Sequence, residues 1–121
     1  MENTNEKPKE VIKPYTEEQI NAHAAKCGGR RNLREIPVLA DEGEYEFWYL
    51  VKKPSRSVLR AIAAEEKKKE KADTDAIQNL MLACVLEGDK EAYEYDGAIY
   101  TQLLKKTGEL ITQAKGELKK L

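Results

Sequence analysis

The feature that most constrains this chain is a run of strand-forming residues from Glu44 to Lys53. The run is rich in aromatic and β-branched side chains, which favour an extended backbone. Side chains alternate between the two faces of a strand. The run therefore has two faces, one with Tyr45, Phe47, Tyr49 and Val51, and the other with Glu46, Trp48, Leu50 and Lys52.

The residues before this run predict a β-hairpin. Residues Arg34 to Ala40 have the pattern of a partner strand, with Ile36 and Val38 on one face. Residues 41–44 are the predicted turn, in which Gly43 supplies a positive φ. An isolated hairpin is only marginally stable in water, so we expect this one to pack on helices or on another chain.

A helix is predicted before the hairpin. Thr16 is a good N-cap residue, and Gln19 stands three residues later, as in a capping box. The helix is expected to run from Glu17 to Cys27. Gly28 and Gly29 then end it, because glycine readily adopts the left-handed conformation found at helix C-termini.

Two more helices are predicted directly after the hairpin. Ser55 is expected to cap the first, which should extend from Val58 to about Lys69. Asp73 or Thr74 is expected to cap the second. Its apolar side chains, from Ile77 to Leu86, cover nearly its whole circumference, which predicts a central core helix.

The last helix is expected to begin at Asp96-Gly97. Glycine inside a helix costs about 1 kcal/mol relative to alanine, so a bend or break is expected near Gly108. The apolar side chains that recur at helical spacing are Ile99, Leu103, Leu110, Ile111, Ala114, Leu118 and Leu121.

Together these elements predict one α+β domain over residues 15–121. It should be mostly helical, with a two-stranded antiparallel β-hairpin packed against about four helices. Residues 1–14 are rich in Lys, Glu, Asn and Pro, and are predicted to form a disordered arm. The total length of 121 residues suits a single core.

Charge and hydropathy argue against several classes of function. The chain has 21 basic and 22 acidic residues and a net charge of −1, whereas a protein that binds nucleic acid or a membrane surface usually has a basic excess. The longest apolar run, Leu80 to Leu86, is far shorter than the ~20 residues of a membrane-spanning helix. The sequence has no secretory signal pattern, so we expect a cytoplasmic protein. Nothing in the sequence requires a disulfide between Cys27 and Cys84.

No residue pattern predicts catalysis, a cofactor or a metal site. His23 is the only histidine, and Cys27 follows one helical turn later. A surface histidine is the favoured interpretation, with a two-ligand half-site or a Cys–His nucleophile as the alternative. Residues 28–31, Gly-Gly-Arg-Arg, follow a predicted helix rather than a strand, so they indicate a helix stop and a basic turn rather than a phosphate loop. We therefore expect that the protein is not an enzyme.

Excess apolar surface favours a protein-binding function. If Tyr49 and its neighbours face the helices, Trp48 and Leu50 face away from them, and such a patch usually marks an interface. The alternative is that another element, such as the first helix, covers this side. The last helix is a second candidate surface. The candidate partner-binding residues are Trp48, Leu50, Leu103, Leu104 and Ile111.

The order of features between Phe47 and Leu110 has a counterpart in a known family. A strand ends in a basic-Pro-Ser turn over Leu50–Arg56, and a helix follows from Val58. An apolar helix then ends in an acidic turn over Asn79–Lys90, and a segment with Tyr and Gly leads into a final helix. This order resembles the tail assembly chaperones of long-tailed bacteriophages and prophages.

The resemblance implies a function without catalytic or cofactor-binding residues. Such chaperones bind the tape measure protein, keep its apolar segments soluble during tail assembly in the bacterial host cell, and are often made in two lengths by ribosomal frameshifting. A homo-oligomer is compatible with this role. Two other classes stay open: a small structural tail or head-completion protein of a phage or prophage, and a small regulatory protein-binding module or antitoxin.

Overall fold

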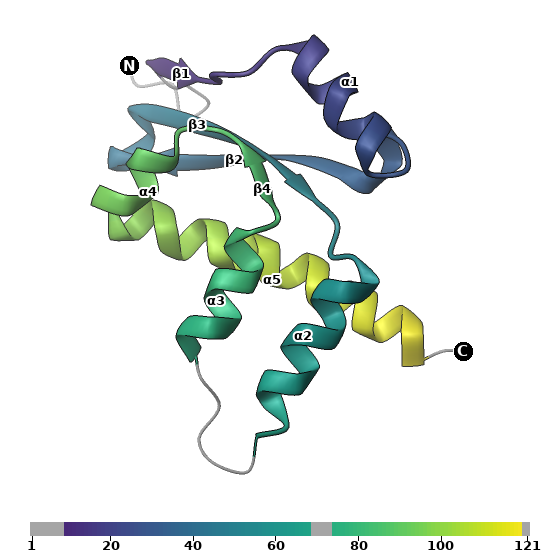
Figure 1. Ribbon diagram of the computed structural model, residues 1–121. Coiled ribbons are helices and arrows are strands. Elements are labelled where there is room, and N and C mark those ends of the chain that lie inside the picture. The colour runs from purple at the N-terminus through teal and green to yellow at the C-terminus, as the bar shows by residue number, and fades with distance from the viewer. Residues whose placement is uncertain (1–8, 69–73, 120–121) are drawn as a thin grey trace.

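The computed structural model describes residues 9–68 and 74–119, and a β-hairpin lies at its centre (Figure 1). Strand β2 (Leu33–Ala40) pairs antiparallel with strand β3 (Tyr45–Lys52) along the full length of both strands. Both strands begin and end within one residue of the predicted positions, so the predicted hairpin is confirmed. The turn between them is the short 3₁₀ segment η2 (Asp41–Gly43), in which Gly43 has the expected positive φ of 89°.

The sheet has four strands, so the expectation of a sheet with only two strands is wrong. Strand β1 (Glu10–Ile12) runs parallel to the start of β3, and strand β4 (Val85–Glu87) runs antiparallel to its end. Both lie along the edge of β3 that β2 leaves open. The backbone of a central strand needs hydrogen-bond partners on both edges, and these short strands supply them. Glu10–Ile12 was expected in a disordered arm; residues 1–8 of that arm lie outside the described residues.

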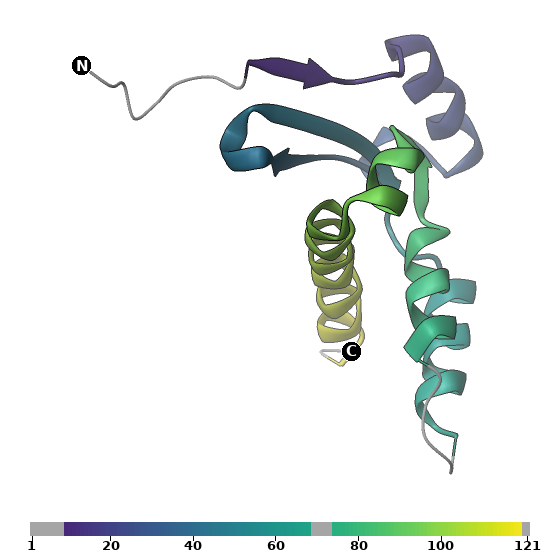
Figure 2. The same ribbon diagram turned by 90° about the vertical axis from the view of Figure 1, so that its left-hand side faces the viewer.

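Helices pack on both faces of the sheet (Figure 2). Helix α1 (Glu17–Lys26) covers part of one face, and helices α4 (Lys90–Tyr95) and α5 (Gly97–Lys119) pack on the other. The predicted alternation along β3 is confirmed. Tyr49 lies in the buried cluster beside α4 and α5, and Leu50 lies in the cluster beside α1.

Helix α1 begins with the predicted capping box. The Gln19 N–H donates to Thr16 Oγ1 at 3.2 Å, and the Thr16 N–H donates to Gln19 Oε1 at 2.8 Å. The helix ends at Lys26, one residue before the predicted end. Gly28 and Gly29 follow with positive φ values of 78° and 114°, and they turn the chain back towards β2.

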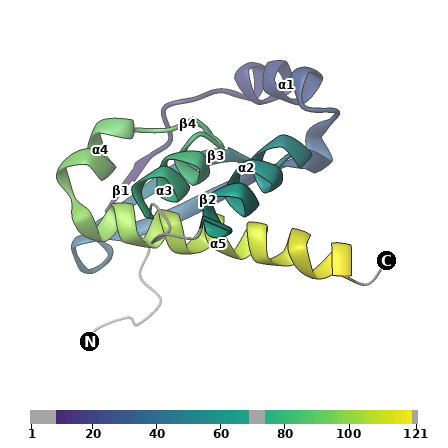
Figure 3. The ribbon, with the colours of Figure 1, turned by 60° about the horizontal axis from the view of Figure 1, so that its bottom comes forward.

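Helices α2 (Arg56–Glu66) and α3 (Thr74–Leu82) lie side by side and extend away from the sheet, next to α5 (Figures 1 and 3). Helix α2 starts at the predicted cap, because Ser55 Oγ accepts the Val58 N–H at 3.3 Å. The helix ends at Glu66, before the expected end at Lys69, which itself lies outside the described residues. Helix α3 is shorter than predicted, because the chain beyond it forms β4 and pairs with β3.

Helix α5 is continuous, so the break predicted near Gly108 is wrong. A Cβ atom at this position would lie 3.3 Å from Cε of Met81 on α3. Gly108 therefore allows the close approach of α5 and α3. Like every other helix in the described part of the chain, α5 is not both long enough and apolar enough to cross a membrane.

Candidate functional site

Most of the residues expected to bind a partner are buried inside the protein. The side chains of Leu50 and Leu103 are 0% exposed, and Ile111 is 6% exposed. The expectation that these three residues form an exposed surface is therefore wrong. Trp48 and Leu104 are partly exposed.

The two sides of the sheet explain this result. Leu50 contacts the cluster beneath α1, whereas Leu103 lies in the cluster between α5 and the sheet. The five predicted residues therefore do not form one surface. The alternative stated from the sequence, that the first helix covers the Trp48 side of the hairpin, is confirmed at Leu50.

Helix α1 covers only part of this face, and the part near the hairpin turn is open. The register places Val11 of β1 and Leu39 of β2 directly opposite Glu46 of β3, one on each side. Val11 is 54% exposed and Leu39 is 49% exposed. Trp48 follows Glu46 on the same face. We call the surface formed by Val11, Leu39, Glu46 and Trp48 the open sheet face.

Polar contacts fix the Trp48 ring at the boundary of this face. Its Nε1–H donates to Glu46 Oε1 at 3.0 Å, and Lys13 Nζ lies 5.2 Å from the ring centroid. Lys13 also pairs with Glu35 at 2.9 Å, and the Tyr15 hydroxyl donates to the same Glu35 oxygen at 3.0 Å. The hydrogen bond from Lys13 lowers the pKa of Glu35. The network orients Trp48 so that part of its ring faces the open surface.

The exposed large apolar side chains of the described residues gather at the hairpin-turn end of the molecule, where β1, η2 and α4 lie (Figure 1). Val11 and Leu39 belong to the open sheet face. Tyr45 lies on the other face, where its ring packs 6.3 Å from that of Phe47. Tyr95, at the end of α4, is 87% exposed. This end of the molecule is therefore the apolar end.

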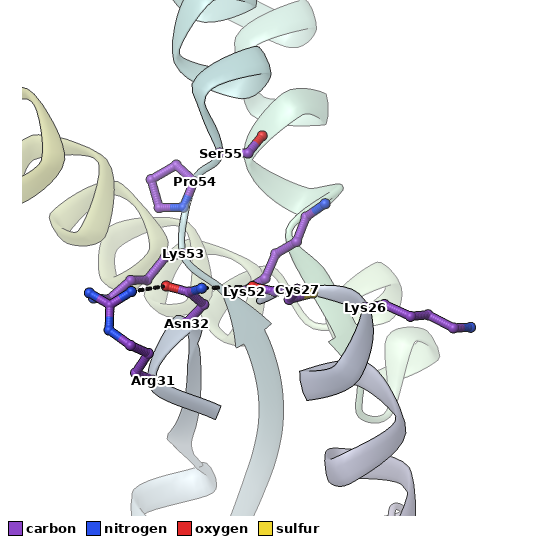
Figure 4. Close-up of a pocket in the computed structure, with 8 residues that line it drawn as sticks. All are labelled: Lys26, Cys27, Arg31, Asn32, Lys52, Lys53, Pro54 and Ser55. Atoms are coloured by element: carbon purple, nitrogen blue, oxygen red, sulfur yellow. Dashed lines mark hydrogen bonds between the residues drawn. The ribbon is translucent and has the colours of Figure 1, made fainter. Parts of the chain in front are cut away.

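A second surface feature lies at the other end of the sheet. A hollow of about 490 Å³ lies between the end of α1, the short segment η1 (Arg30–Asn32) and the start of α2. Figure 4 shows the side chains that line it. Its lining includes four cationic side chains and no carboxylate. The lining residues are Lys26, Cys27, Arg31, Asn32, Lys52, Lys53, Pro54 and Ser55.

Hydrogen bonds connect the segments around this hollow. Asn32 Nδ2 donates to the Cys27 carbonyl at 2.7 Å, and the Lys53 N–H donates to the Asn32 carbonyl at 2.8 Å. The Lys52 N–H donates to the Cys84 carbonyl at 2.9 Å. The basic residues therefore extend from a well-connected backbone. The interpretation of residues 28–31 as a basic turn did not predict that Arg31 lines the same hollow as Lys52 and Lys53.

His23 contacts the edge of the sheet, and both cysteines are free thiols. His23 Nε2 lies 2.8 Å from Glu87 Oε2, which joins α1 to β4. Cys27 and Cys84 are both free, and burial raises the pKa of the Cys84 thiol. Within residues 9–68 and 74–119, no group of three or more His, Cys, Asp or Glu side chains is placed to hold a metal ion.

Two surfaces therefore stand out, an open apolar sheet face and a basic hollow at opposite ends of the sheet. Residues from several elements build each of them. Comparisons with protein-family models, with curated proteins and with solved structures gave no match to this chain.

Proposed function

We propose that this protein binds an apolar segment of a partner protein on its open sheet face. The observation that carries the proposal is the exposure of Val11 and Leu39 on the two sides of Glu46. Clustered apolar side chains on the surface of a small domain usually mark an interaction site. Trp48 supplies the aromatic anchor that such sites commonly contain.

The strand edges favour one geometry for the partner. The outer edge of β2 is not free to pair with another strand. Pro37 has no N–H to donate. The carbonyls of Pro37 and Leu39 already accept hydrogen bonds from Lys106 Nζ at 2.7 Å and from Gln102 Nε2 at 2.9 Å. Such features block the addition of another strand. Strand β1 has no strand partner on its outer edge among the described residues. An extended partner segment would therefore pair with β1 and place its side chains against Val11.

The resemblance to tail assembly chaperones supplies the narrower form of the proposal. The partner would be the tape measure protein of a phage tail, and the bound segments would be those that aggregate before assembly. A share of 36% charged residues suits a protein that must keep such a complex soluble.

Co-expression tests this narrower form. The native gene is expressed with an N-terminal tag together with its downstream reading frames, and the captured products are measured by intact mass. Two tagged products with a common N-terminus and a long helical partner are expected. A single tagged product without such a partner would contradict the tail chaperone proposal and favour a structural particle component or a regulatory module.

Two matched variants test the surface itself. Val11→Asp combined with Leu39→Asp is expected to reduce partner capture at least tenfold, because a buried unpaired carboxylate costs several kcal/mol. Tyr95→Asp changes an apolar residue that is even more exposed and lies on the opposite side of the sheet, and it should leave capture unchanged. Circular dichroism of both variants should match the native protein. If the Val11/Leu39 variant is folded and still captures the partner, the open sheet face is not the binding site.

A further inference from the structure

We propose that the end of the molecule opposite the apolar end binds the phosphate backbone of a nucleic acid. The surface consists of residues 26–34 and 52–60, which we call the basic end. These two segments contain eight basic residues and no acidic one. The basic residues are Lys26, Arg30, Arg31, Arg34, Lys52, Lys53, Arg56 and Arg60.

The fold brings the two segments into contact. Leu33 and Lys52 are paired across the hairpin, and the Lys53 N–H donates to the Asn32 carbonyl at 2.8 Å. The guanidinium of Arg34 is held by the carbonyls of Arg31 and Leu33, at 2.9 Å and 2.8 Å from Nη1. Two cations from each segment therefore line the hollow of about 490 Å³: Lys26, Arg31, Lys52 and Lys53.

The positive charges of this surface are almost entirely uncompensated. Arg30 pairs with Glu17 at 2.7 Å. For the other seven basic residues, no carboxylate in the described part of the chain lies within ion-pair distance. By contrast, Lys9, Lys13 and Lys115 each pair with a glutamate. A surface of unpaired cations attracts a polyanion, and binding releases the counterions condensed on that polyanion.

The arrangement suits an extended anion better than a single small one. In Figure 4, the side chains of Arg31 and Lys53 lie on one side of the hollow, Lys52 points towards Ser55, and Lys26 points away. The charges are spread around the hollow and do not converge on one point. Successive phosphates of a nucleic-acid strand would match this spread. The two segments contain no aromatic residue for base stacking, so binding should be independent of base sequence.

The net charge of −1 does not oppose this inference, because segments 26–34 and 52–60 contain no acidic residue and about a third of the acidic residues lie at the apolar end. Residues 41–46 and 91–96, at the apolar end, include Asp41, Glu42, Glu44, Glu46, Glu91, Glu94 and Asp96. At physiological ionic strength, electrostatic interactions between exposed charges decay over about 8 Å. A phosphate backbone at the basic end is therefore screened from the acidic residues at the other end of the sheet.

Fluorescence anisotropy with a labelled DNA duplex of mixed sequence, over a series of salt concentrations, tests the proposal on the full chain. We expect binding that weakens steeply with salt. Arg31→Gln combined with Arg56→Gln removes two exposed cations from the basic end. This variant should weaken binding about tenfold at low salt and reduce the slope of log Kd against log salt by about 2. A matched control, Lys90→Gln combined with Lys105→Gln, removes the same charge from exposed positions elsewhere and should change neither quantity.

Three results would overturn the proposal. The first is the absence of binding to both duplex and single-stranded DNA at low salt. The second is an equal loss of affinity in the Lys90/Lys105 control, which would indicate a general charge effect. The third is self-association of the protein alone at low salt that the Arg31/Arg56 variant abolishes, since the basic end would then bind the acidic end of a second copy. None of these assays requires the protein partner, so their outcome is independent of the proposed function.

Discussion

At the scale of single residues, Gly88 shows why one position next to the sheet must be glycine. It follows β4, has a φ of 132°, and lies directly beside the Tyr49 ring. A Cβ atom at Gly88 would overlap that ring. The ring has little freedom to move, because its hydroxyl donates to the Asp89 carbonyl at 2.7 Å. Both the backbone conformation and the packing therefore exclude a side chain.

Gly88→Ala is therefore expected to reduce the free energy of unfolding by about 2 kcal/mol or more. Urea denaturation monitored by circular dichroism measures the change. Gly97 is the matched control, because a Cβ there would meet no atom within 4 Å, and Gly97→Ala should be neutral or slightly stabilising. Equal stability of the two variants would show that Tyr49 does not pack against Gly88 as described.

Buried tyrosines give the stability a dependence on alkaline pH. Burial raises the pKa of both Tyr15 and Tyr49 above the usual value. Because folding favours their neutral form, their contribution to stability is complete at neutral pH and is lost as the pH rises above about 10. We expect the melting temperature to fall over this range, and Tyr49→Phe to reduce the fall. An alkaline decrease of the same size in Tyr49→Phe would exclude Tyr49 as a contributor.

The sequence predicts well those residues whose role depends on near neighbours. The capping box of Thr16 and Gln19 and the alternation along β3 are both local patterns, and both are confirmed. Leu39 was missed, although it lies between two core positions of its strand and therefore points to the opposite face. Its exposure depends on how far α1 extends over the sheet, which cannot be predicted from the residues around Leu39.

At the scale of elements, α5 separates residues that the sequence placed together. Leu103 is fully buried against the sheet, whereas its neighbour Leu104 is partly exposed. Leu103→Ala is expected to cost about 3 kcal/mol of unfolding free energy, and Leu104→Ala about 1 kcal/mol or less. Chemical denaturation of both variants provides the comparison. Similar losses in the two would mean that α5 is rotated relative to the arrangement described.

The short strands show where prediction from sequence fails at this scale. Strands β1 and β4 have three residues each, which is too few for a periodic pattern. Each forms only because β3 offers an unpaired edge. The apolar run that ends in β4 fits a buried helix and a buried strand equally well. The position at which α3 ends is therefore decided by the pairing of β4 with β3, a strand more than thirty residues earlier in the chain.

At the scale of the whole molecule, the two ends of the sheet differ in chemistry. One end combines exposed apolar side chains with acidic ones, and the other carries unpaired basic side chains around a hollow. Composition and net charge average over both ends, which is why the sequence alone argued against nucleic acid. Counting charges separately over residues 26–34 and 52–60 would have found the basic end. The apolar end could be recognised only from the four-stranded sheet, because β1 brings Val11 next to β3 only in the folded chain.

The most direct test of the central claim is amide hydrogen exchange of the protein, free and in complex with its captured partner. Binding on the open sheet face predicts slower exchange in β1 and at Glu46–Trp48, with no change in α2 or α3. The single tryptophan, Trp48, should also shift its fluorescence to shorter wavelength as the partner covers it. Slower exchange confined to α2, α3 or the C-terminal half of α5, with β1 unchanged, would contradict the claim that the open sheet face binds the partner.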